Sequence, residues 1–118
     1  MTKKESTTTT LTREALLGAI KSEHREVEVK GIGTVMIRSW SPVARSRRQA
    51  SIASMSKDKQ FYFATVYAVV DMVCDAEGVP MFTDDDIPLL TAEGVSSSKL
   101  DLLHDACQAF DEHEAGNE

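Results

Sequence analysis

The longest apolar stretch of the chain runs from Gln60 to Glu77, where aromatic, valine and alanine side chains follow one another almost without interruption. Valine favours strands, but a run of this length that ends at Gly78 is more typical of a helix buried on most of its sides. We therefore predict a helix over about residues 60–77. Asp71 is its one interior charge, and we place this residue at the boundary of the core.

Two further helices are predicted after Gly78. Thr83 has a good N-cap side chain, and the acids that follow it would lie near the positive end of the helix dipole. Phe82 and Ile87 have the spacing of a hydrophobic staple. Pro88 is unfavourable inside a helix that starts at Thr83, so we expect an irregular or tight first turn before a helix over about 86–93. A final amphipathic helix is predicted over about 97–111.

The N-terminal half contains a different period. Apolar and polar residues alternate in two short runs that Gly31-Ile32-Gly33 separates; the apolar positions are Val27, Val29, Val35 and Ile37. This pattern predicts a β-hairpin over about 25–39, which must pack on helices or find a third strand elsewhere. A short amphipathic helix is predicted after the N-cap Thr12, and a mostly exposed helix over about 42–55 begins with Ser41-Pro42.

These elements predict one α+β domain over residues 11–111. The domain is mostly α-helical, with an N-terminal β-hairpin packed on a helical C-terminal half. Residues 1–10 are polar and unpatterned, which predicts a disordered tail, and residues 112–118 are predicted to form a frayed acidic tail. A chain of 118 residues is long enough for one such core without disulfide or metal support.

The net charge of −6 is unevenly distributed. From Arg38 to Lys59 six basic residues face Asp58 alone, a balance of +5, whereas from Asp71 onward thirteen acids face only Lys99, a balance of −12. Two solvated faces would explain this polarity, and so would a charged interaction surface. The candidate interaction residues are a basic segment (Arg45, Arg47, Arg48, Lys57 and Lys59) and an acidic helix start (Asp84, Asp85 and Asp86). The arginines could hold a phosphate backbone or meet an acidic protein surface.

Candidate chemistry is sparse. The sequence has no nucleophile elbow, phosphate loop or metal-ligand spacing, so we expect neither an enzyme nor a metal or cofactor site. Cys74 and Cys107 lie in helix-like apolar patterns and are interpreted as reduced core residues. We expect no signal peptide at the start of the chain, and no segment reaches the roughly 18 apolar residues of a membrane span.

One binding motif competes with these interpretations. The stretch from Leu89 to Leu100 has the alanine, turn-glycine, valine, serine and leucine pattern of a helix-turn-helix, with helices over about 86–93 and 97–110. Its recognition helix would carry Lys99 together with Asp101 and Asp105. Because DNA affinity depends mainly on phosphate neutralisation, this charge argues against nucleic acid as a partner.

Two stretches resemble the tail assembly chaperones of long-tailed bacteriophages with non-contractile tails. The segment from Gly31 to Arg38, GIGTVMIR, is similar to the family's glycine-then-strand segment, which ends in arginine. The segment from Asp75 to Asp86, DAEGVPMFTDDD, is similar to the family's Asp-x-x-Gly-x-x-x-Phe-(Thr/Ser)-x-x-Asp stretch. The helical runs around the second stretch agree, so the resemblance covers about residues 12–110. Pro88 departs from the helix that the family pattern implies after this start.

The resemblance implies a non-enzymatic protein of the host cytoplasm that is absent from the finished virion. It would bind the tape measure protein, keep it soluble and help recruit tail tube subunits, through a longer frameshifted form where one exists. A homo-oligomer is also expected. Because of the charge split, we hypothesise that the basic segment of one copy meets the acidic C-terminal half of the next, in a head-to-tail arrangement that could coat an extended partner.

Overall fold

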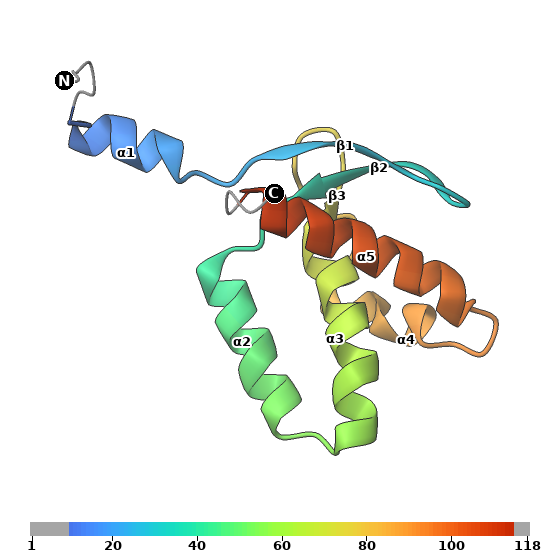
Figure 1. Cartoon of the computed structure of the whole chain (residues 1–118). Helices are drawn as coiled ribbons and strands as arrows, with labels where there is room; N and C mark the ends of the chain where they lie inside the picture. The colour runs from blue at the N-terminus through green and yellow to red at the C-terminus, as the bar shows by residue number, and fades with distance from the viewer. Residues whose placement is uncertain (1–9, 115–118) are drawn as a thin grey trace.

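A computed structural model describes residues 10–114. Its elements in chain order are α1 (Arg13–Ala19), β1 (His24–Val29), β2 (Gly33–Arg38), α2 (Pro42–Ala53), α3 (Lys57–Met72), β3 (Val73–Cys74), the 3-10 turn η1 (Asp84–Asp86), α4 (Ile87–Leu90) and α5 (Ser97–Glu114). The predicted α+β class, mostly helical with an N-terminal hairpin on a helical C-terminal half, is confirmed (Figure 1). Residues 1–9 of the predicted disordered tail and 115–118 of the predicted acidic tail lie outside the described range.

The predicted hairpin occupies β1 and β2, which pair in antiparallel register with Val27 opposite Val35. Gly31 and Gly33 have φ of 90° and 135° in its turn, a region that favours glycine. The sheet has a third strand, because Val73 of β3 lies opposite Ile37 of β2. The hairpin therefore gains the support that its sequence requires.

That third strand corrects the helix predicted over 60–77. The helix begins at Lys57 and ends at Met72, since Val73 takes extended angles (φ −76°, ψ 128°) and pairs with β2. A tight turn follows, in which the Asp75 carboxylate accepts the backbone N–H groups of Glu77 and Val79. Valine-rich sequence is compatible with both helix and strand, and pairing with a buried β2 residue decides where one gives way to the other.

The core lies where α3 meets both α5 and the sheet. Ile37 of β2, Val66 and Val69 of α3, and Cys107 of α5 are each 0% exposed. In Figure 1 the hairpin runs above α5, and α2 with α3 forms a helical pair that extends below it. The second half of α3 is thus the central element, and its first half lies nearer the surface, with Phe61 and Tyr62 exposed.

The segment around Pro88 has the tight first turn that was predicted. Residues Asp84–Asp86 form a 3-10 turn before α4, and Thr83 and Asp86 make a capping box in which the Asp86 carboxylate accepts the Thr83 N–H at 2.8 Å. The predicted C-terminal end of the helix over 86–93 is wrong, because α4 ends at Leu90. The Thr91 hydroxyl, just after this end, donates to the Ile87 carbonyl. The final helix, predicted over 97–111, continues to Glu114, so 112–114 are helical rather than frayed.

The short N-terminal helix is also confirmed. Thr12 is its N-cap, with the side-chain oxygen accepting the Ala15 N–H at 3.1 Å. In Figure 1 α1 projects away from the rest of the molecule, and none of its residues is buried. Its apolar edge is therefore exposed.

Candidate functional site

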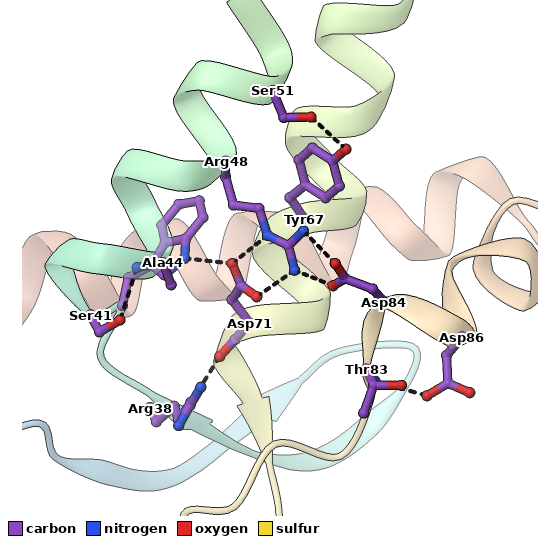
Figure 2. A network of polar contacts seen from close by, with 11 residues as sticks. Arg38, Ser41, Ala44, Arg48, Ser51, Tyr67, Asp71, Thr83, Asp84 and Asp86 are labelled. Carbon is purple, nitrogen blue, oxygen red and sulfur yellow. Dashed lines mark hydrogen bonds and ion pairs between the residues drawn. The ribbon is translucent and has the colours of Figure 1, made fainter.

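The basic segment and the acidic helix start meet at one place, the side chain of Arg48. Its guanidinium donates to both carboxylate oxygens of Asp71 on α3, at 2.9 Å each, and to both oxygens of Asp84 on η1, at 2.6 and 3.3 Å. Figure 2 shows Arg48 of α2 reaching between these two acids. We call Arg48, Asp71 and Asp84 the arginine clamp. It joins the consecutive helices α2 and α3 to η1.

The interpretation of Asp71 as a boundary residue is wrong. Asp71 is 7% exposed and Arg48 is 5% exposed, so this ion pair is buried. The Trp40 indole N–H also donates to Asp71, at 2.8 Å, and the Arg38 side chain donates to the backbone carbonyl of the same residue. An interior charge is tolerated here because every one of these groups has a hydrogen-bonding partner.

The surroundings of Arg48 stabilise the charged form of its guanidinium. Its guanidinium carbon lies 4.4 Å from the centre of the Tyr67 ring, and Tyr67 is itself within hydrogen-bond distance of the Ser51 hydroxyl. The hydrogen bond to Asp71 is the main reason that the pKa of Arg48 is raised above its usual value. In turn, the hydrogen bond from Arg48 lowers the pKa of Asp84 below its usual value. The charged groups of the arginine clamp are therefore paired with one another.

The other candidate residues are not gathered in one site. Arg45 forms an ion pair with Asp111 of α5, and its guanidinium also lies over the Trp40 ring. Arg47, Lys57 and Lys59 are exposed, and so is Asp85. We hypothesised that the basic segment contacts a neighbouring copy. Only its exposed residues are now available for such a contact. The sequence analysis noted the lone charge of the apolar helix, Asp71, but misplaced it at the boundary of the core, and it did not use the single tryptophan of the chain, Trp40.

A groove between α3 and α5 was not predicted. It has a volume of about 510 Å³, and its residues include Phe61, Tyr62 and the buried Leu100. Acidic side chains frame it, with Asp58 on α3 and Asp101 and Asp105 on α5. Phe61 is 83% exposed, which is unusual for so large an apolar side chain. We call this surface the acidic groove. A groove lined by both apolar and acidic side chains suits a helix that carries apolar residues between basic ones.

The described residues contain neither a metal-binding cluster nor a membrane-spanning helix. Within residues 10–114 no cluster of three or more histidine, cysteine or acidic side chains is placed to hold a metal ion. In the same range no helix has the length and apolar character needed to cross a bilayer. Where the helix-turn-helix alternative needs its first helix, the structure has only the four residues Ile87–Leu90 in α-helical form.

Burial explains the behaviour of the two cysteines. Both are free thiols with no exposed surface, and desolvation raises the pKa of each above its usual value, for Cys107 to about 12. The interpretation of these residues as reduced core residues is confirmed.

Comparisons with known proteins add one finding. No family model matches the chain, and no curated protein sequence matches it. The structure is similar to a solved structure described as that of the bacteriophage HK97 tail assembly chaperone, with a TM-score of 0.53 and 21% sequence identity. The match covers 84% of this chain and 99% of that chain. At this identity the likeness establishes a shared fold.

Proposed function

We propose that this protein is a tail assembly chaperone of a long-tailed bacteriophage. In this role it binds the tape measure protein, keeps it soluble and helps recruit tail tube subunits. The observation that carries the proposal is the fold shared with the HK97 tail assembly chaperone, which extends over nearly the whole of that chain. The two stretches that carry the sequence resemblance both lie in defined parts of this fold. The GIGTVMIR stretch contains β2, and the DAEGVPMFTDDD stretch contains the turn that leads into η1 together with η1 itself.

Surface chemistry supports binding rather than catalysis. The titratable groups at the centre of the molecule are tied to one another in the arginine clamp, whereas large apolar side chains such as Phe61 and Leu89 are exposed. Exposed apolar surface framed by charge is typical of protein interaction sites. A tape measure protein is expected to be a long helix with amphipathic stripes, and several copies of a small helical domain could cover it. We therefore also propose a homo-oligomer and a non-enzymatic role.

The test is co-expression with a candidate tape measure protein, to be sought as a very long and mostly helical protein encoded near this gene. Light scattering on a sizing column would measure whether that protein becomes soluble in a complex with several copies of this chain. The control is the same tape measure protein expressed with an unrelated small acidic domain. A tape measure protein that stays insoluble with both would refute the proposal, and a shift of labelled DNA at moderate salt would favour the helix-turn-helix alternative instead.

Localisation provides a second test. The proposal places the chain in the host cytoplasm and excludes it from the mature particle. Peptide mass spectrometry should find it in infected-cell lysate and not in purified virions. Recovery from virions at the copy number of a tail protein would assign it a structural role. Tail tube recruitment through a frameshifted longer form predicts a second, larger product that contains this chain's peptides.

A further inference from the structure

Helix α1 has an exposed apolar edge. Arg13, Leu16, Leu17 and Ile20 recur at i, i+3, i+4 and i+7, and therefore share one side of the helix. The three apolar residues of this set are 50%, 49% and 71% exposed. Lys21 follows at the far end, so the edge consists of apolar residues with a basic residue at each end. We call these five residues the α1 stripe.

A helix as short as α1 requires a partner surface. It has seven residues, and none of them is buried in its own chain. Isolated helices shorter than about 12–15 residues are marginal in water, because the cost of the first turn is not recovered by the few hydrogen bonds that follow. The N-cap at Thr12 offsets only part of this cost. Stable formation of α1 thus depends on burial of the α1 stripe.

The acidic groove has the matching chemistry. Phe61 and Tyr62 supply exposed apolar surface, whereas Asp58, Asp101 and Asp105 supply negative charge around it. Lys57 and Lys59 neighbour Asp58 in the sequence but are not among the residues that line the groove. An apolar stripe that ends in Arg13 and Lys21 is complementary to this surface in apolar character and in sign of charge, and the ion pair between Arg13 and Glu14, 3.9 Å apart with both side chains exposed, offsets only part of that positive charge.

We propose that the α1 stripe of one copy docks in the acidic groove of a second copy. Each chain carries one stripe and one groove on different parts of its surface, so the contact is heterologous and head-to-tail, and it can be repeated from copy to copy. This inference rests on the homo-oligomer of the proposed function and names its interface. It differs from the hypothesis based on the basic segment, since the positive charges now come from α1.

The experiment uses two variants of the full chain, each defective in one half of the contact. Leu16→Glu with Ile20→Glu removes the stripe, and Phe61→Lys removes the groove; all three positions are exposed, so the core is left intact. Val43→Glu, at a residue 75% exposed on α2, is the matched control for a charge placed on an apolar surface position. Sedimentation velocity over a range of concentrations measures association, and circular dichroism confirms folding of every variant.

Each defective variant alone is expected to remain monomeric where the wild type associates, with a dissociation constant raised by about 30-fold or more. An equimolar mixture of the two is the decisive sample, because it retains one intact stripe and one intact groove. The mixture should form a 1:1 dimer and stop there. The Val43→Glu control should associate as the wild type does.

Three results would overturn the inference: a mixture that stays monomeric while the wild type associates, variants that associate like the wild type, or a wild type that is monomeric because α1 occupies its own groove. Failure of the proposed function is seen separately. If the mixture forms its dimer but the wild type leaves the tape measure protein insoluble, the interface stands and the chaperone role does not.

Discussion

Replacement of Arg48 by methionine tests the central claim about the core. The change keeps a long side chain but removes all four hydrogen bonds to Asp71 and Asp84. Of the donors described for the Asp71 carboxylate, only the Trp40 indole N–H would remain. A carboxylate that is 7% exposed and has lost its counter-charge typically costs about 3–5 kcal/mol of unfolding free energy.

The size of this effect makes it easy to measure. Domains of this size have a free energy of unfolding of about 5–15 kcal/mol, and each kcal/mol lost lowers Tm by about 4 °C or more. We therefore expect Arg48→Met to lower Tm by about 12–20 °C. Urea denaturation followed by circular dichroism measures the free energy directly. The matched control is Arg47→Met, which alters an exposed arginine on the same helix and should change stability by less than about 0.5 kcal/mol.

A double variant separates loss of the pair from loss of packing. Arg48→Met combined with Asp71→Leu removes both buried charges, so it should be more stable than Arg48→Met alone by roughly 2 kcal/mol, although the Trp40 N–H then lacks its acceptor. The reasoning about the arginine clamp fails if Arg48→Met and Arg47→Met are equally stable, or if the double variant is the least stable of the three.

Further predictions concern an acid, a glycine and a thiol. Because the hydrogen bond from Arg48 lowers the folded-state pKa of Asp84, the contribution of Asp84 to stability is fully present above about pH 4 and decreases as pH falls towards the folded pKa. Urea titrations should show Asp84→Asn destabilised by up to about 1 kcal/mol at pH 7 and by less at pH 3, and the control Asp85→Asn, at an exposed position, should change stability little at pH 7. Gly78→Ala should lower the free energy of unfolding by at least about 1 kcal/mol, because φ is +82° and the added methyl group would lie 2.8 Å from the His24 ring. The control Gly94→Ala, whose methyl group would meet no atom within 4 Å, should be near neutral in the same urea assay. Cys107, with a pKa raised to about 12, should react with a thiol reagent at pH 8 only at the rate of unfolding, and fast labelling of the native protein would refute its burial.

Local signals in the sequence predicted the starts of elements well. The N-caps at Thr12, Ser41 and Thr83 all lie where expected, since a cap is decided by a side chain and backbone groups within three residues of it. The same holds for the tight turn before Pro88, where one residue's missing N–H excludes a regular start. Such features need no knowledge of the rest of the fold.

Features that depend on distant residues were missed or misplaced. Val73 leaves the helix because Ile37, far earlier in the chain, offers a strand to pair with. Asp71 is buried because Arg48, on another helix, neutralises it. Neither partner can be recognised from local pattern, since an arginine on a polar helix is usually solvated. The acidic groove was missed for the same reason, as it forms only where α3 and α5 lie side by side.

The internal pairs also change what the charge split means. Arg48 and Arg45, the residues that made the basic segment appear suited to an acidic partner, are used within the chain. Asp101 and Asp105, by contrast, are exposed at the acidic groove. The acidic groove itself disfavours a phosphate backbone and favours a helix with basic ends. The α1 stripe has such basic ends, so the contact that we propose between neighbouring copies draws its positive charge from α1 and does not require the basic segment.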